Sequence, residues 1–284
     1  MTSEANPGKT SEAIPAKERF PRSPLVPSQS PKFWVKEKDR YLRQLLINDI
    51  QGATGRPFFV YFAQLDQIIN HTDPDDLAEI LSGIEGDEAD FFIQTPGGNV
   101  DATEKLIGIL RQRLKSWRVI VPSWAKSAGT VIALSSNEIL LGINSELGPI
   151  DPQWLANGLN IPCEILGKDP SQPFHIQQLA QLAVKRMRQL ATTLLEKGMM
   201  KGKTAQEIED VLKKISTADG YMSHGAVIDY DEAGSLGLSV SFLKPEDNLW
   251  KQLWLLYCMY DYDTKANGIG RIIEGTKFSI SRPK

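Results

Sequence analysis

The sequence has few of the residues from which metal sites and disulfide frameworks are built. Its 284 residues include only two cysteines and three histidines. Cys163 and Cys258 form no C-x-x-C pair and have no neighbouring histidine ligands, which argues against a structural zinc site or a disulfide framework. We therefore predict no metal, no cofactor and a reducing compartment.

Charge of one sign and long apolar runs are also missing. The 32 basic and 35 acidic residues nearly cancel, so the bulk charge does not indicate nucleic acid or an anionic membrane as a partner. No stretch approaches 18 uninterrupted apolar residues, and the amino terminus lacks a charged-then-apolar secretion signal. The glycine pair Gly97-Gly98 forms no G-x-G-x-x-G motif and is not followed by Gly-Lys-Ser/Thr, so it is not one of the common nucleotide loops. These absences predict a cytoplasmic protein without membrane insertion.

The chain divides into a tail, a core and a C-terminal extension. Residues 1–32 contain six prolines among polar residues and predict a disordered tail, and a domain begins near residue 33 with a helix over 33–50. Strands are predicted at 58–62, 91–94, 119–121 and 138–141, with helices between them, the first capped by Asp73. This alternation favours an α/β fold with a largely parallel sheet.

The second half of the core is predicted to be mainly helical. A long amphipathic helix over 176–194 ends at Gly198 and forms either part of the core or a subunit contact. A helix over 204–215 and a short strand near 237–240 follow. After about residue 244 we expect an apolar helix around Trp250 and Tyr257, and then a polar, glycine-containing tail through residue 284.

Ser127 lies where the third strand turns into a short helix, and two glycines follow the second strand at 97–98. The carboxyl ends of parallel strands meet at one edge of a sheet, so Ser127 and the glycine pair are expected to be neighbours. Alone, Ser127 is more simply a helix cap and Gly97-Gly98 an ordinary tight turn. Together they provide a hydroxyl beside backbone N–H groups, which suits an oxyanion.

Four motifs carry a resemblance to a known superfold. Residues 95–99 read TPGGN, 126–130 read KSAGT, 147–153 read LGPIDPQ, and an acidic segment at 231–233 leads to Gly237. Together they resemble the Clp-protease/crotonase superfold, a ββα spiral, and within it the serine dehydrogenase proteinase family, relatives of signal peptide peptidase A. The resemblance covers roughly residues 35–243 and implies a serine peptidase domain over 33–243. It also implies a homo-oligomer that cuts peptides or unfolded proteins.

By this resemblance Ser127 is the nucleophile, and the N–H groups of Gly98 and Ala128 form the oxyanion hole. Gly97 and Asn99 are expected to contact the substrate. The catalytic base is where the sequence departs from the Clp pattern, because the loop that carries the Clp histidine holds Asp151 here.

His224 lies where the Clp aspartate is expected. We therefore predict an exchanged triad, in which His224 is the base for Ser127 and Asp151 orients His224. A lysine base is the alternative. Lys126 is adjacent to the nucleophile but is expected to point away from it, whereas Lys168 lies downstream and needs burial to lower its pKa.

Two other functions share this fold. A crotonase-like acyl-CoA enzyme uses two backbone donors in the same way, but no acidic residue can be placed as its base. A catalytically silent oligomeric scaffold is the third possibility, because the base departs from the Clp pattern.

Overall fold

The computed structural model describes residues 30–156 and 158–284, in two compact units that divide after Lys38. The first unit includes helix α1 (Pro31–Lys36), capped by the Ser30 hydroxyl, which accepts a hydrogen bond from the Phe33 N–H. The single helix expected over 33–50 is two helices, since α1 ends at Lys36 with Glu37 as its C-cap, and α2 runs over Lys38–Thr54. Most of the predicted disordered tail lies outside the described residues.

A seven-stranded sheet forms the centre of the second unit, with the order β11-β10-β1-β2-β3-β5-β9. Five neighbouring strands are parallel, and they are β1 (Phe58–Ala63), β2 (Glu88–Gln94), β3 (Ser116–Val121), β5 (Glu138–Gly142) and β9 (Val240–Leu243). Two antiparallel strands, β10 (Ile269–Gly275) and β11 (Ser279–Pro283), extend the sheet beyond β1. The α/β class with a largely parallel sheet is confirmed.

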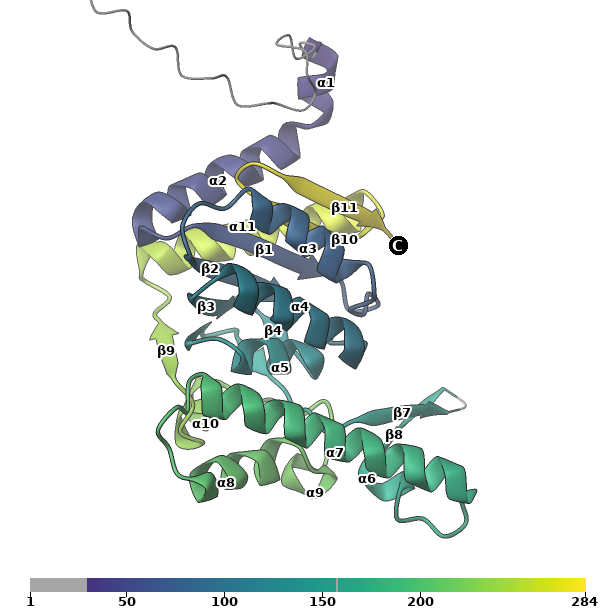
Figure 1. The fold of residues 1–284 in the computed structure, drawn as a ribbon. Coiled ribbons are helices and arrows are strands. Elements are labelled where there is room, and N and C mark those ends of the chain that lie inside the picture. The colour runs from purple at the N-terminus through teal and green to yellow at the C-terminus, as the bar shows by residue number, and fades with distance from the viewer. Residues whose placement is uncertain (1–29, 157) are drawn as a thin grey trace, which may run out of the picture. The chain divides into compact units, whose positions relative to one another are not determined.

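Helices cover both faces of the sheet (Figure 1). On one face, α3 (Asp73–Ser82), α4 (Val100–Arg113) and α5 (Ala128–Leu134) pack against side chains such as Phe59, Tyr61 and Phe91. On the other face, α2 and α11 (Asn248–Ala266) pack against Phe58 and Phe92. Successive residues of a strand point to opposite faces of the sheet, and here helices cover both faces. Every residue of β1 is therefore buried, which explains its unbroken apolar run.

Helical appendages follow the core strands. The long helix α7 (Phe174–Lys197) ends at Gly198 as predicted, and α8 (Ala205–Ile215) begins with a capping box between Thr204 and Glu207. The smaller elements are β7 (Gln153–Ala156), β8 (Leu159–Pro162), α6 (Cys163–Leu166), α9 (Ala218–Tyr221) and α10 (Tyr230–Ser235). The antiparallel hairpin β7–β8 was not anticipated from the sequence.

Two local predictions are wrong. The polar tail expected after the last helix is the hairpin β10–β11, whose first strand pairs with β1. The carboxylate of Asp73 does not cap α3, because Thr72 occupies the N-cap position and Asp73 lies inside the helix. Asp73 is instead buried and accepts hydrogen bonds from the Asn70 N–H and the Tyr61 hydroxyl.

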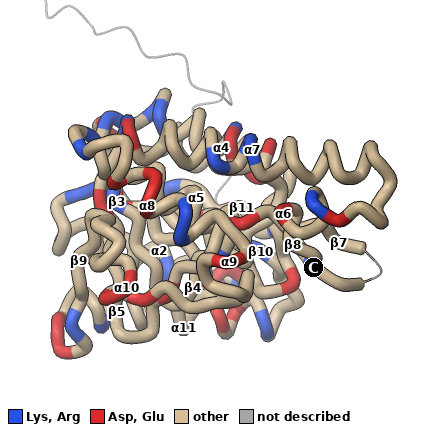
Figure 2. The backbone as a smooth tube through the Cα atoms, turned by 90° about the horizontal axis from the view of Figure 1, so that it is seen from below, with Lys and Arg blue, Asp and Glu red and all other residues tan. Residues whose placement is uncertain are grey.

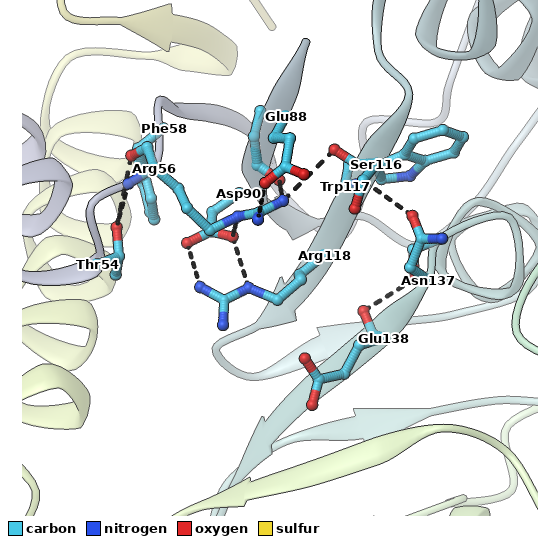
Figure 3. A network of polar contacts seen from close by, with 12 residues as sticks. Thr54, Arg56, Phe58, Glu88, Asp90, Ser116, Trp117, Arg118, Asn137 and Glu138 are labelled. Atoms are coloured by element: carbon cyan, nitrogen blue, oxygen red, sulfur yellow. Dashed lines mark hydrogen bonds and ion pairs between the residues drawn. The ribbon is translucent and has the colours of Figure 1, made fainter. Parts of the chain in front are cut away.

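A charged network holds the amino-terminal edge of the sheet (Figure 3). The side chain of Asp90 in β2 is fully buried and accepts hydrogen bonds from Arg118 Nε at 2.8 Å and Arg56 Nε at 3.1 Å. Arg56 also pairs with Glu88. These ion pairs lie at the edge opposite to the strand ends where ligands bind in parallel sheets, so we assign them to the framework.

Elsewhere the basic and acidic residues are interspersed over the elements (Figure 2). Among residues 30–156 and 158–284, none of the helices combines the length and the apolarity that a membrane span requires.

Candidate active site

Three chain segments run side by side beyond the carboxyl ends of β2, β3 and β5. Thr95, directly after β2, forms a parallel bridge with Ala125, and the short strand β4 (Trp124–Ala125) pairs in parallel with β6 (Glu146–Leu147). The glycine loop (residues 95–99), Ser127 and the segment that leads to Asp151 are therefore brought to one edge of the sheet. The sequence predicted this for Ser127 and the glycine pair.

Ser127 lies between β4 and α5 in an unusual backbone conformation. Its φ of 52° and ψ of −117° make it one of the two non-glycine residues with positive φ in the described part of the chain. Ser127 occupies the N-cap position of α5, yet its hydroxyl makes no capping hydrogen bond. The strained turn therefore does not serve to cap the helix, and strain of this kind is typical of turns that present a nucleophile.

The glycine loop lies against Ser127. A Cβ atom added to Gly97, which has a φ of 97°, would lie 2.8 Å from Ser127 Cβ, so only glycine fits there. Both backbone groups of Gly97 are bonded within the protein, because its N–H donates to Thr95 Oγ1 and its C=O accepts from Ile69. Gly97 thus packs closely on Ser127 and has no free backbone group for a substrate.

Gly98 presents its N–H in a different way. Ile69 bonds to the residues on both sides of Gly98, because the Ile69 N–H donates to Gly97 and the Ile69 C=O accepts from Asn99. Since the Gly97 C=O and the Gly98 N–H belong to one trans peptide group and point in opposite directions, the Gly98 N–H faces away from Ile69. In the ranges that the structure describes, neither this N–H nor that of Ala128 donates a hydrogen bond to the protein. Both are available to an external acceptor.

Asn99 has a structural function that the sequence did not indicate. Its side chain caps α4, because Oδ1 accepts a hydrogen bond from the Ala102 N–H at 2.9 Å. Asn99 was predicted to contact the substrate, and its side-chain oxygen is already engaged in this cap.

His224 and Asp151 come together from segments 73 residues apart. His224 Nδ1 lies 2.7 Å from Asp151 Oδ1, and the side chains are 27% and 5% exposed. Asp151 is held in turn by Gln153, whose Nε2 donates to Oδ2 at 2.5 Å. With Nδ1 bonded to a carboxylate, the other imidazole nitrogen, Nε2, is left to accept a proton. The described residues hold no hydrogen bond between this Nε2 and Ser127 Oγ, a contact that is often long before substrate binds.

Lys126 ties these segments to the serine turn. Its Nζ donates to the C=O groups of Leu147 and Ala226, both at 3.0 Å, and lies 3.1 Å from a carboxylate oxygen of Glu146. Leu147 and Ile228 also form an antiparallel bridge. Lys126 therefore joins the segment before Asp151 to the segment after His224, a function that sequence reasoning missed because it treated Lys126 only as a base.

Lys168 lacks the properties of a lysine base. Its side chain is 72% exposed and forms an ion pair with Glu164 at 2.8 Å. The hydrogen bond that Lys168 donates to Glu164 raises the pKa of Lys168, whereas a base near neutral pH needs a lowered pKa. In the described ranges, no cluster of three His, Cys, Asp or Glu residues could hold a metal ion.

The site geometry agrees with the result of a comparison with known families. Residues 67–265 match the family of ClpP-like SDH-type serine proteinases. The chain belongs to this family. The match supports a peptidase. It favours the peptidase over the acyl-CoA enzyme that the sequence had left as an alternative. Strands β10 and β11 lie outside the part of the chain that matches the family.

Two curated relatives come from Methanocaldococcus jannaschii. The uncharacterized protein MJ0137 is 34% identical over 182 residues, which cover 61% of this chain and 62% of the relative. The uncharacterized protein MJ1495 is 28% identical over 176 residues, which cover 59% and 58%. The chain thus spans about three fifths of the length of each.

Solved structures of proteases share a similar arrangement at low sequence identity. A variant of the 1510-N membrane-bound stomatin-specific protease is 20% identical, with a TM-score of 0.48 that covers 69% of this chain and 84% of the protease. ClpP1 from Listeria monocytogenes is 18% identical, with a TM-score of 0.43 that covers 73% and 99%. Membership of the family rests on the sequence match.

Proposed function

We propose that this protein is a serine endopeptidase in which Ser127 is the nucleophile, His224 the general base and Asp151 the residue that orients His224. The observation that carries the proposal is the hydrogen bond between His224 and Asp151 at the edge of the sheet where Ser127 occupies a strained turn. A histidine of this kind is held in the tautomer that accepts a proton at Nε2, and the carboxylate stabilises the imidazolium that forms.

In this mechanism the Ser127 hydroxyl attacks the peptide carbonyl while His224 Nε2 takes the hydroxyl proton. The oxyanion of the tetrahedral intermediate accepts hydrogen bonds from the Gly98 and Ala128 N–H groups, each worth about 3 kcal/mol of barrier. His224 then returns its proton to the leaving amine, and the C–N bond breaks to give an acyl-serine. Water, deprotonated by His224, releases the acid and regenerates Ser127.

We also infer that the substrates are peptides or unfolded proteins, that the protein forms a homo-oligomer, and that it works in the cytoplasm. Exposed apolar residues on α7, Phe174, Leu179 and Leu182, support a subunit contact. The two cysteines are free, which suits a reducing compartment.

A fluorophosphonate probe tests the proposal on the full-length protein. We expect the probe to label Ser127, as located by mass spectrometry, and we expect Ser127→Ala to abolish labelling and His224→Ala to slow it strongly. Ser123→Ala is the matched control, because Ser123 is also partly exposed and lies before β4, and it should label like the unmodified protein. A folded protein that does not label is a silent scaffold, and labelling that survives Ser127→Ala assigns the nucleophile elsewhere.

A further inference from the structure

The position of Gly98 is set by its neighbour Ile69. A Cβ atom on Gly98 would lie 2.4 Å from Ile69 N and 2.5 Å from Ile69 O, so the two backbones are in direct contact. The hydrogen bonds of Ile69 with Gly97 and Asn99, 2.8 and 2.9 Å long, bracket Gly98. Any shift of Ile69 therefore moves the Gly98 N–H, which has to lie within a few tenths of an ångström of its place to stabilise an oxyanion.

Ile69 belongs to no regular strand, and a buried ion pair holds the residues on both sides of it. Arg271 Nη1 donates to the Ile68 C=O at 3.0 Å and to Asp73 Oδ2 at 2.7 Å. The same Oδ2 accepts the Asn70 N–H at 2.8 Å. One guanidinium nitrogen thus connects to the chain before Ile69 directly and to the chain after it through Asp73.

This ion pair is fully enclosed but incompletely bonded. The side chains of Arg271 and Asp73 are 5% and 0% exposed. In the described part of the chain, Arg271 Nε and Asp73 Oδ1 are buried without a hydrogen-bond partner. Burial raises the pKa of Asp73 even though Arg271 opposes the rise. Buried ion pairs of this kind add little stability over apolar residues of similar size, so their value lies in geometry.

Arg271 comes from β10, beyond the part of the chain that matches the family. On the same strand, Glu274 points to the other face of the sheet and pairs there with Arg43, at 2.8 Å from Arg43 Nε. Arg43 is as deeply buried as Arg271, at 4% exposure for each residue, and also bonds to Asp263. The strand therefore carries two comparable buried ion pairs, of which only one reaches the glycine loop.

We propose that Arg271 is a positioning residue of the active site, which holds Ile68 and Asp73 and through Ile69 keeps the Gly98 N–H aimed at the oxyanion. The C-terminal hairpin β10–β11 thereby completes the site. This inference rests on the function proposed for Gly98.

Two measurements on full-length variants separate the steps of this argument. The first is amide hydrogen exchange at Ile69 and Asn99. It reports the brace, meaning the hold of Arg271 on Ile68 and Asp73, whether or not the protein is catalytic. Arg271→Met should speed exchange at both amides by at least about tenfold, because they lose the support of Ile68 and Asp73. Arg43→Met, the matched control, should leave them unchanged and speed exchange in α11 instead.

The second measurement is the rate constant of labelling by the fluorophosphonate. Arg271→Met should lower it by about 10²-fold, the effect of losing one oxyanion donor. Arg43→Met should label nearly as fast as the unmodified protein while folded, and Arg271→Lys, which keeps a cation opposite Asp73, should recover most of the rate. If Arg271→Met does not fold, Asp73→Asn removes the charge with little change of shape, and the same two readouts apply.

Unchanged exchange at Ile69 and Asn99 in folded Arg271→Met would overturn the brace. Faster exchange with unchanged labelling, or equal slowing in Arg43→Met, would overturn its link to the oxyanion hole. Absence of labelling in the unmodified protein would instead remove the proposed function, while exchange would still decide whether Arg271 holds the loop.

Discussion

The substitution Asp151→Asn should inactivate the site because of a neighbouring residue, Gln153. Gln153 Nε2 donates to two oxygens of Asp151, the carboxylate Oδ2 at 2.5 Å and the backbone C=O at 3.2 Å. An asparagine there must turn its own oxygen toward Gln153 and therefore its NH2 group toward His224 Nδ1. Nδ1 then has to accept that bond, the ring proton moves to Nε2, and Nε2, the nitrogen proposed as the base for Ser127, can no longer accept a proton.

The expected loss is large. The wrong tautomer in a Ser-His-Asp triad costs about 10⁴-fold in rate, which corresponds to about 5 kcal/mol of activation free energy. The double variant Asp151→Asn/Gln153→Leu removes the donor that orients the amide, so the asparagine oxygen is free to accept from Nδ1. We expect the double variant to regain at least about tenfold, or 1.4 kcal/mol.

The assay is the second-order rate constant for labelling of Ser127 by the fluorophosphonate, measured on protein whose fold is verified by circular dichroism. Gln153→Leu alone is the control, since it keeps the Asp151 carboxylate against His224 and should retain most of the rate. If Asp151→Asn labels as fast as the unmodified protein, Asp151 does not orient the base. If the double variant is no faster than the single one, the argument from Gln153 is wrong.

Three further predictions follow from charged residues near and far from the site. Lys168→Ala should leave labelling unchanged, because Lys168 is exposed and its hydrogen bond with Glu164 raises its pKa; a strong loss would restore the lysine base. Lys126→Met should lower the free energy of unfolding by about 2 kcal/mol in urea, because two backbone carbonyls lose a charged donor; an unchanged midpoint would contradict this. The pKa of Glu207 is lowered to about 2, chiefly by the hydrogen bond from the Thr204 N–H. Since the unfolded value is about 4.3, the stability that Glu207 contributes is present above that pH and disappears as the pH falls toward 2. The gap in stability between the unmodified protein and Glu207→Gln should close over that range, and a gap that persists at pH 2 would refute the assignment.

Much of the fold could be predicted because its signals are local. The apolar run at 58–62 reports a strand with both faces covered, and the small residues after Ser127 report a buried helix. The proximity of Ser127 to the glycine pair could be predicted from the rule that ligand-binding loops lie together at the carboxyl ends of parallel strands.

The remaining features depend on partners far away in the chain. Residues 269–283 look like a polar tail because Arg271 and Glu274 are charged, and they are buried only because Asp73 and Arg43 lie opposite them. The proximity of His224 and Asp151 depends on the bridge between Leu147 and Ile228, which no periodicity reveals. The catalytic roles of Ser127, His224 and Asp151 stay predictions until the variants are measured.

The pairing of β10 with β1 has a consequence for the order of assembly during synthesis. Tyr61 and Arg271 are in contact although 210 residues separate them, so Tyr61 leaves the ribosome long before its partner exists. Contacts of such long range form late in folding, because closing the intervening loop costs conformational entropy. On the proposal above, a nascent chain in which the turn at Ser127 has already folded still lacks the residue that supports its glycine loop. On the same proposal, the oxyanion hole is completed only when the strand that carries Arg271 has been added.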